Sequence, residues 1–584
     1  MRTMYCGEVL EKHVNKTIFL CGWVQNIRKF GNFIFIDMRD CTGLIQILFD
    51  FTYTKKILEA KKLKNEFCIQ VIGKVQLRNK KNVNLKLFTG TIELLATSLL
   101  IFNSSDPLPL DNYKKNKETV RLKYRYLDLR KPSMLYILKL RSKITHWIHN
   151  FMNLNNFINV ETPILTKSTP EGARDYIVPS RNYPKKFYAL PQSPQIFKQL
   201  LMISGFDRYY QIVKCFRDED LRSDRQPEFT QIDFEMSFMT ADQVRNFIEL
   251  MIIQLWLKIK QIKLKPFPVM NFEDVINLYG TDKPDLRNPI KLIEISDLLS
   301  VNICNFIYKN YNVKNSRIAA FVIPKNIKLN KCNIIKYFDL MKKYEICNLF
   351  YLKINIKKFN NNNNNNFVQQ LWNTGCMQKI ICRMNIKDGD FIFIIGHLKK
   401  IVNKAFNIFR KQLNIDFNLI NKKSWRPLWI INFPLFYKKN NARFYSMHHP
   451  FTSPKNINDL ENIKNPKKVI ADSYDLVING YEIGGGSVRI HNLNIQQKIF
   501  DILGIDKVAQ KEKFGFFIEA LKFGTPPHAG MALGLDRIVM LLSKTNDIKD
   551  VIAFPKTTEA TCLTTQAPSY LDINTLNKLF IKTN

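Results

Sequence analysis

The first hundred residues alternate apolar and polar positions in short runs, which turn-forming residues separate. A period of two is the pattern of a strand with one buried face, so these runs predict β-strands. Five strands can be delimited, at 18–27, 33–39, 43–49, 67–77 and 91–99. Five short strands in one stretch are typical of a small closed barrel. The prolines and small polar residues that follow predict a linker.

Helical periodicity begins after this linker. Apolar residues at near-helical spacing predict a helix from Ser133 to about Asn153. A second helix is expected to start at Ser193, with Pro194 in its first turn. Gln195 and Lys198 stand three residues apart on that helix and therefore share one face.

A β-hairpin with a charged loop is predicted next. Residues 209–217 are rich in β-formers, and polar and apolar residues alternate over 231–238. This alternation places Gln231, Asp233 and Glu235 on one face of the sheet. A solvated polar face is the usual interpretation of such a hairpin. The alternative is that a polar ligand occupies the face.

The pattern changes over residues 288–423, where Lys, Asn and Ile predominate and asparagines fill 360–366. The asparagine run predicts a flexible loop. Apolar stretches such as 391–395 predict packed α+β structure around it. We find no catalytic constellation in this segment.

Pattern returns near the C-terminal end of the chain. Adjacent His448 and His449 on an extended segment should point to opposite sides, which argues against joint metal ligation. Three successive glycines at 484–486 leave backbone open to a ligand, between carboxylates and an arginine. Gly534 stands where a glycine-punctuated strand runs into a helix.

Composition narrows the class of protein. The chain has 584 residues, enough for several domains, and 46% of them are hydrophobic, so it is globular. Its formal charge of +38 favours a polyanionic partner such as tRNA. The surplus of Lys, Asn, Ile, Phe and Tyr has a second explanation, an AT-biased genome, and both stay open.

Other functions are disfavoured by what the pattern lacks. No apolar run approaches the ~18 residues of a membrane span. The N-terminus has no apolar secretory core, so we expect a cytoplasmic protein. Its eleven cysteines form no CxxC pair, which disfavours structural zinc and a disulfide framework.

One stretch carries a family resemblance. Residues 209–235, YYQIVKCFRDEDLRSDRQPEFTQIDFE, resemble the second signature motif of class II aminoacyl-tRNA synthetases, in the form found in the bacterial aspartyl enzymes. FINVETPIL, residues 157–165, is predicted to be a strand and resembles the first motif. GTPPHAGMALGLDRIVMLL resembles the third motif, and CGWVQNIRKFGNFIFIDMRD is similar to the family's anticodon-binding barrel. The resemblance covers residues 1–287 and 424–570 well and the segment between them poorly.

The resemblance implies an α+β multidomain fold. It consists of an N-terminal OB-fold barrel, a class II catalytic domain built on an antiparallel sheet with flanking helices, and an inserted α+β domain. The expected limits are 1–105 for the barrel, 106–120 for a hinge, 121–287 and 424–584 for the two parts of the catalytic domain, and 288–423 for the insert.

Site residues follow from the same resemblance. The catalytic residues would be Arg217, Glu482 and Arg537. Aspartate would contact Glu171, Gln195, Lys198, Arg217, Asp233, His448 and Arg489. ATP would contact Arg217, Asp218, Glu219, Gln226, Glu482, Gly534, Leu535, Asp536 and Arg537. Asp475 and Glu482 are suitable ligands for Mg²⁺ on the triphosphate.

The partners are implied in the same way. Arg28, Phe35, Gln46 and Glu93 would read the anticodon of tRNA-Asp, with Phe35 stacking on a base. Pro163 would lie at the interface of a homodimer, and 169–181 would be a loop that closes over the substrate. Whether tRNA-Asn is also charged is left open by the sequence.

The predicted reaction is activation of L-aspartate by ATP, followed by transfer to the 3′ end of tRNA. The attacking carboxylate is already ionised, so the site must supply positioning and positive charge on the phosphates, which Arg217 can do. We expect Lys198 and Arg489 to select aspartate, because asparagine would leave them unpaired. The rival functions are a relative that activates asparagine or lysine, an AMP-forming aspartate ligase that does not use tRNA, and a binding protein that has lost catalysis.

Overall fold

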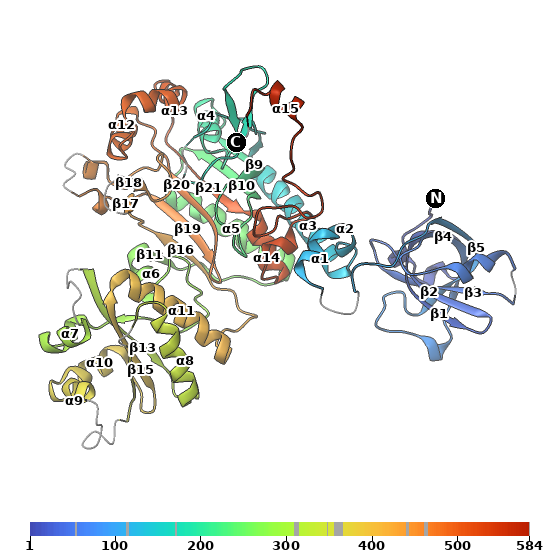
Figure 1. Cartoon of the computed structure of the whole chain (residues 1–584), viewed down its shortest axis with the longest axis horizontal. Helices are drawn as coiled ribbons and strands as arrows, with labels where there is room; N and C mark the ends of the chain where they lie inside the picture. Colours follow the sequence, from blue (N-terminus) through green and yellow to red (C-terminus); the bar gives the residue numbers. More distant parts are fainter. Residues whose placement is uncertain are drawn as a thin grey trace. The chain divides into compact units, whose positions relative to one another are not determined.

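The structure of the chain is a computed structural model (Figure 1). It describes residues 1–52, 55–111, 116–169, 172–308, 315–346, 349–355, 366–439, 443–460 and 465–582. The chain divides into two compact units, Met1–Tyr136 with Cys562–Ala567, and Ile137–Thr561 with Pro568–Asn584. Residues 121–136 thus group with the barrel, whereas the sequence assigned them to the catalytic domain. The domain limits stay predictions.

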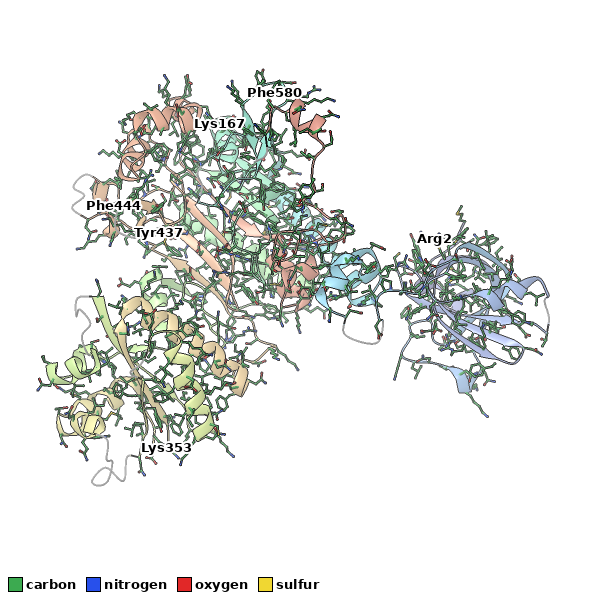
Figure 2. The ribbon with its side chains drawn as sticks, in the orientation of Figure 1. Arg2, Lys167, Lys353, Tyr437, Phe444 and Phe580 are labelled. Carbon is green, nitrogen blue, oxygen red and sulfur yellow. The ribbon has the colours of Figure 1, made fainter. Side chains whose placement is uncertain are left out.

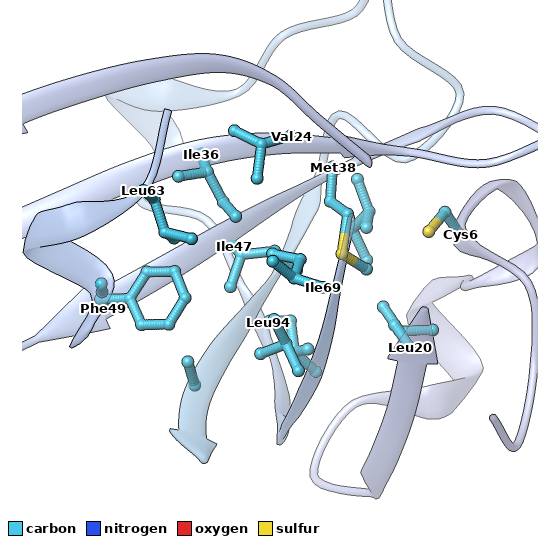
Figure 3. Close-up of a cluster of buried hydrophobic side chains, with 14 of the residues drawn as sticks. Cys6, Leu20, Val24, Ile36, Met38, Ile47, Phe49, Leu63, Ile69 and Leu94 are labelled. Carbon is cyan, nitrogen blue, oxygen red and sulfur yellow. The ribbon is translucent and has the colours of Figure 1, made fainter. Parts of the chain in front are cut away.

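Five strands close a barrel in the first unit, in the order β1-β2-β3-β5-β4. Inward positions alternate along them and bury residues such as Val24, Ile36, Ile47, Ile69 and Leu94 in one core (Figure 3). The outward positions are thereby left to carry polar and aromatic side chains. The bounds are β1 Thr17–Phe30, β2 Phe33–Arg39, β3 Leu44–Asp50, β4 Cys68–Leu77 and β5 Ile92–Asn103.

A buried carboxylate organises the two short helices that follow, α1 (Glu118–Lys123) and α2 (Arg125–Asp128). Asp128 is fully buried, and its carboxylate lies within 3.0 Å of Arg121, Arg125 and Lys131. A buried charge is tolerated only when it is paired, and here three cations surround one anion. The segment is therefore fixed by charge as much as by apolar packing.

An eight-stranded sheet forms the centre of the second unit, in the order β11-β16-β19-β20-β21-β10-β9-β6. The six inner strands are antiparallel, and each edge strand pairs parallel to its neighbour. The bounds are β6 Ile158–Asn159, β9 Arg208–Phe216, β10 Glu228–Ser237, β11 Val269–Asn271, β16 Pro427–Ile431, β19 Ser473–Ile478, β20 Tyr481–Val488 and β21 His528–Gly534.

Helices pack against this sheet. They are α3 (Pro132–Leu154), α4 (Gln195–Ile203), α5 (Ala241–Lys260) and α14 (Leu535–Ser543). Strand β10 shows how the sequence pattern sets the layers. Its Phe234 contacts Phe157 and Phe247 on one face, whereas Asp233 and Glu235 are on the other and are fully buried. The polar face predicted for this strand is therefore real but is not solvated.

A second, smaller sheet with order β12-β13-β15-β14 forms the core of the inserted segment. One apolar cluster lies between this sheet and α8 and α11, and another between the sheet and α7, α9 and α10 (Figure 1). The bounds are β12 Ile293–Glu294, β13 Ser316–Ile323, β14 Leu349–Lys353, β15 Phe391–Leu398, α7 Val301–Tyr308, α8 Lys331–Lys342, α9 Asn366–Asn373, α10 Cys376–Met384 and α11 Lys399–Phe417. The predicted flexible asparagine loop lies outside the described residues up to Asn365.

The remaining elements are small. Two hairpins, β7–β8 and β17–β18, stand apart from the sheets, and the second carries the Tyr437 and Phe444 labelled in Figure 2. The bounds are β7 Ile177–Pro179, β8 Phe187–Ala189, β17 Phe436–Lys439, β18 Arg443–Ser446, α6 Phe272–Tyr279, α12 Leu493–Ile502, α13 Lys507–Ala520 and α15 Ile573–Lys578. Short 3₁₀ helices occupy Cys6–Glu8, Glu11–His13, Lys55–Lys62, Lys80–Asn82, Ser296–Leu298, Ile457–Leu460, Pro466–Lys468 and Ile548–Val551.

Two local predictions are wrong. Helix α4 begins at Gln195 with Pro194 at the N-cap, so Ser193 stands outside it. The predicted strand at 157–165 is reduced to the two residues of β6, because the rest of the segment has no ladder partner in the described chain. None of the described helices combines the length and apolarity that crossing a membrane would require.

Candidate active site

A cavity of about 430 Å³ opens on the polar face of the large sheet. It brings together residues from four regions that are far apart in the sequence. Among the predicted residues, its lining includes Gln195, Lys198, Arg217, Glu219, Gln226, Asp233, His448, Asp475, Glu482, Arg489, Gly534, Asp536 and Arg537. Asp218 and Leu535 do not line it, and Glu171 lies outside the described residues.

Two cations and two carboxylates form a buried network at the closed end of the cavity. Lys198 Nζ donates to Asp233 Oδ1 at 2.6 Å and lies 3.3 Å from Glu235 Oε2. Arg489 holds the same Glu235 with two hydrogen bonds, of 2.8 and 3.1 Å. Burial raises the pKa of Glu235, but Arg489 and Lys198 more than offset this and hold it below its ordinary range. Glu235 is therefore ionised, whereas burial raises the pKa of Asp233 although Lys198 opposes this.

This network corrects the predicted basis of aspartate selection. We expected a neutral substrate side chain to leave Lys198 and Arg489 without counter-charge. Asp233 and Glu235 already provide that charge, so the expectation is wrong in this form. The alternation along β10 showed the carboxylates, but only the pairing of β10 with β21, and of β21 with β20, brings Glu235 to Arg489.

The two adjacent histidines both line the cavity, contrary to the prediction that they point to opposite sides. The chain bends at residues 447–448 instead of continuing the extended β18. His448 Nε2 lies 3.2 Å from Asp475 Oδ1, and His449 Nε2 lies 2.6 Å from Arg489 Nη1. Because arginine can only donate, His449 Nε2 accepts. Burial and the charge of Arg489 keep the pKa of His449 well below its usual value.

Three buried polar atoms at this end have no hydrogen-bond partner within the described residues. They are Gln195 Nε2, Asp233 Oδ2 and His448 Nδ1. Buried polar atoms are rarely left unsatisfied in native proteins, and exceptions are concentrated where a ligand binds. The three atoms belong to residues predicted to bind the amino acid. Their arrangement fits a small ligand with both donor and acceptor groups.

Arg217 differs from the other cations of the cavity. Its guanidinium carbon lies 5.1 Å from the ring centre of Phe229. No carboxylate of the described residues pairs with it, whereas Lys198, Arg225, Arg489 and Arg537 each have an acidic partner. An unneutralised guanidinium in a cavity is suited to an incoming anion such as a phosphate.

Two of the residues predicted to contact the nucleotide instead make hydrogen bonds within the protein. Gln226 exchanges two hydrogen bonds with the backbone of Lys556. Asp536 accepts from the backbone of Thr230 at 2.8 Å and from Arg141. Both polar ends of each side chain are thus occupied. We infer that these two residues shape the cavity wall through their partners.

Arg537 and Glu482 meet at the open end of the cavity. Arg537 Nη1 donates to the carbonyl of Glu482 at 2.7 Å and lies 4.0 Å from its carboxylate. Gly534 precedes the helix that carries Arg537, as the sequence predicted. Glu219 pairs with Arg225 at 2.9 Å on the opposite loop.

The two predicted metal ligands, Asp475 and Glu482, lie on the neighbouring strands β19 and β20. A side chain at Gly485 would place its Cβ 2.7 Å from Asp475 Oδ1, so the glycine leaves room beside this oxygen, which also lies 3.2 Å from His448 Nε2. The described residues contain no cluster of three or more metal-ligating side chains. Two carboxylates suit Mg²⁺ bound together with phosphates and water, so the residues fit that ion.

Some residues of the site were missed by sequence reasoning. Glu235, which is buried behind the cavity lining, was noted only as part of a polar face, and His449 was expected to point away from His448. Phe229, which faces Arg217, carried no signal in a single sequence. Asp224, 3.4 Å from Arg537, was hidden in the charged loop, where several acids alternate with arginines.

The four predicted anticodon residues lie together on the outer face of the barrel, where Gln46 and Glu93 are buried beneath their neighbours. Arg28 donates to Gln46 at 3.0 Å, and Gln46 donates to Glu93 at 2.7 Å. Phe35 lies beside the exposed Phe30 and Phe33, with ring centres 6.2 and 6.5 Å away. An aromatic platform next to a row of polar side chains suits unstacked bases. The roles of these residues stay predictions.

A second surface feature surrounds Pro163. An open groove of about 460 Å³ is lined by Pro163 and by exposed apolar residues that include Leu165, Phe187 and Tyr188. Such patches on a protein surface mark interaction sites more often than chance would give.

Comparison with known proteins places these features in a family. A family model described as "tRNA synthetases class II (D, K and N)" matches residues 117–558, and one described as "OB-fold nucleic acid binding domain" matches residues 18–101. A relative named aspartate--tRNA ligase from Buchnera aphidicola subsp. Acyrthosiphon pisum is 54% identical, over 100% of this chain and 99% of its own length. The relative of the same name from Buchnera aphidicola subsp. Schizaphis graminum is 52% identical, with the same coverage.

Solved structures agree in fold. An asparaginyl-tRNA synthetase from Pyrococcus horikoshii, complexed with asparaginyl-adenylate, matches with a TM-score of 0.58 and 18% identity, over 95% of this chain and 98% of that one. The enzyme from Entamoeba histolytica matches with the same score and 17% identity. At this identity the likeness shows the fold alone. The predicted α+β fold class, with an OB-fold barrel and a class II domain, is confirmed.

Proposed function

The chain belongs to the class II tRNA synthetases of the aspartate, lysine and asparagine group, and within it to the aspartate–tRNA ligase family, and we propose that it joins L-aspartate to tRNA-Asp in two steps. In the first step the aspartate α-carboxylate attacks the α-phosphorus of ATP and releases pyrophosphate. In the second step the 3′ end of the tRNA takes the aspartyl group from AMP. The observation that carries the site assignment is Arg217, which has no carboxylate partner among the described residues, beside Lys198 and Arg489, which each have one.

Arg217 stabilises negative charge on the α-phosphate. A carboxylate nucleophile needs no general base, so electrostatic stabilisation and alignment account for the catalysis. The lack of an internal counter-ion means that Arg217 gains its partner only when the phosphate arrives. Arg537 and Glu482 are proposed to act at the terminal phosphates. Asp475 and Glu482 would hold Mg²⁺, which screens the charge of the triphosphate when bound.

The donors of the network favour aspartate over asparagine. Arg489 has five N–H donors, and four are directed at Glu235, His449 and Ser487. Lys198 also retains donors beyond its bond to Asp233. A substrate carboxylate can accept from the remaining N–H of Arg489 and from the remaining donors of Lys198, whereas the amide NH₂ of asparagine would bring another donor to them. A site built this way rejects the wrong side chain by a factor on the order of 10⁴.

The α-ammonium and backbone of the substrate have candidate partners too. Asp233 Oδ2 is a free acceptor, and Gln195 offers the amide whose nitrogen lacks a partner in the described chain. His448 and Glu171 complete the proposed pocket. The predicted closure of the loop over the substrate includes Glu171, which lies outside the described residues.

The barrel is proposed to bind the anticodon of tRNA-Asp through Arg28, Phe35, Gln46 and Glu93. We also propose a homodimer, which the apolar groove at Pro163 supports, and action in the cytoplasm, where tRNA and ATP are available to this family. Charging of tRNA-Asn is an outcome to be measured and is not part of the proposal.

One experiment tests the function. The full chain is incubated with ATP, labelled aspartate and separately transcribed tRNA-Asp and tRNA-Asn, with labelled asparagine as control. Charging of tRNA-Asp by aspartate alone is the expected result. Aspartate-dependent pyrophosphate exchange without any charging would refute the tRNA step, and exchange driven equally by asparagine would refute the pocket assignment.

A further inference from the structure

Residues 281–287 lead from α6 into the inserted domain and bring a lysine to the edge of the active site. Lys283 Nζ lies 3.9 Å from Glu482 Oε2, and Arg537 Nη1 lies 4.0 Å from the same oxygen. The described residues place no other carboxylate within 4 Å of this ammonium. A separation of 3.9 Å is too long for a hydrogen bond, so the N–H groups of Lys283 are available to another acceptor.

The segment that carries Lys283 is fixed against the strands of the site. Asp285 holds Arg287 with bonds of 2.9 and 2.7 Å, which closes the segment on itself. A Cβ added at Gly480 would lie 3.3 Å from the Cβ of Asp285. Because φ of Gly480 is also +87°, glycine is the residue that suits this close turn. Gly480 is in the turn between β19 and β20, the strands of Asp475 and Glu482. The segment that carries Lys283 is therefore held beside the turn that joins the two carboxylate strands.

The inserted domain fixes this segment from the other side. Arg410 on α11 is 3% exposed, and its Nη2 donates to the carbonyls of Asp285 and Asn288, at 3.2 and 2.9 Å. Asn288 returns a bond of 3.0 Å to the Arg410 carbonyl. The guanidinium packs 4.9 Å from the ring centre of Tyr279. No acidic side chain of the described residues pairs with it, so a cation is buried at some cost to hold two carbonyls.

The residues that follow the inserted domain are hydrogen-bonded to the same turn between β19 and β20. Asn479 accepts from the backbone of Arg426 at 2.9 Å and donates to the carbonyl of Ser424 at 3.2 Å. The turn that joins the two carboxylate strands is thus held by the start and by the end of the insert. An insert that served only as an appendage would not require both attachments.

We propose that Lys283 contacts the terminal phosphates of ATP beside Glu482, and that Arg410 is the positioning residue that fixes the Lys283 segment. The proposal rests on the proposed function, because it takes the triphosphate to lie over Glu482 and Arg537. Phosphate oxygens between Lys283 and Arg537 would replace two long ion pairs with charge-assisted hydrogen bonds. The inserted domain then contributes to activation although it carries no residue in the cavity.

The test is Lys283→Met in the full chain, assayed by ATP–pyrophosphate exchange. Loss of one charge-assisted hydrogen bond should raise the KM for ATP and for pyrophosphate about tenfold or more. The KM for aspartate and the inhibition constant of AMP, which lacks the terminal phosphates, should stay within about twofold. Lys283→Arg should recover most of the loss. Lys336→Met is the matched control, because it removes an equal charge from the surface pair of Lys336 with Asp416 in the insert.

Arg410→Met tests the positioning role. It should reproduce the rise for ATP and pyrophosphate, and the effect should not add to that of Lys283→Met in the double variant. If Arg410→Met does not fold, Arg410→Lys replaces it, because lysine keeps the charge but not the planar guanidinium. Its effect should likewise not add to that of Lys283→Met. Unchanged KM for ATP in a folded Lys283→Met variant overturns the proposal, as do equal losses for ATP, AMP and aspartate. If wild type shows no aspartate-dependent exchange, the proposed function itself has failed.

Discussion

Replacing Arg217 with alanine should slow adenylate formation and leave the fold intact. The guanidinium of Arg217 has no carboxylate partner among the described residues, so its removal strands no buried charge. What the fold loses is the contact with the Phe229 ring at 5.1 Å. Such a cation–π contact contributes about 0.5–1 kcal/mol at a partly exposed site. We therefore expect little change in thermal stability.

The expected loss of rate is larger. A preorganised donor aimed at developing charge is worth a factor of about 10² to 10³, or about 2.7–4 kcal/mol of transition-state stabilisation. The effect should fall on the maximal rate of aspartate-dependent pyrophosphate exchange, because the charge grows only as the phosphorus is attacked. Activity and stability should thus separate at this residue.

Pyrophosphate exchange at saturating substrates, together with a thermal melt, measures both quantities. Arg222→Ala is the matched control, because Arg222 is exposed on the same loop and does not line the cavity. It should leave exchange unchanged. A folded Arg217→Ala variant with an exchange rate near that of wild type would refute the reasoning, and so would an equal loss in the Arg222 control.

Three further variants should separate the parts of the molecule. Lys198→Met leaves Asp233 and Glu235 with one cation, so thermal melts should show an unfolding free energy that is lower by about 3–5 kcal/mol. Exchange assays should show a higher KM for aspartate and an unchanged KM for ATP. Equal rises in the two KM values would contradict this. Asp128→Asn should destabilise the chain at neutral pH: burial raises the pKa of Asp128, but bonds from Arg121 and Lys131 hold it below its ordinary 3.8, so its contribution is present above that pH and is lost as pH falls through the lower folded-state value, which melting temperatures at several pH values would follow. Gln46→Ala breaks the bonds to Arg28 and Glu93 and should raise the KM for tRNA-Asp about tenfold in charging assays while exchange stays normal; a matching loss of exchange would argue against an anticodon role.

Much of the architecture could be read from local patterns. Period-two runs located the five barrel strands to within a few residues, because a strand with one buried face must alternate. The same rule placed Asp233 and Glu235 on one face of β10. The resemblance of the sequence motifs to those of the family identified the family and thirteen of the residues that line the cavity. The strand predicted at 157–165 was wrong in length, because only Ile158 and Asn159 pair with a neighbouring strand among the described residues.

Charge pairing was decided by the tertiary structure. Arg489 and Glu235 are 254 residues apart in the sequence and meet only because β10, β21 and β20 are neighbours in one sheet. The sequence shows how many cations and carboxylates a site can draw on, but not which of them neutralise each other. For that reason it suggested Lys198 and Arg489 as free cations, whereas Arg217 is the one left unpaired among the described basic residues of the cavity. Periodicity determines which face a side chain is on, because that depends on its immediate neighbours. Its electrostatic partner depends on strand order and register, which form over the whole chain.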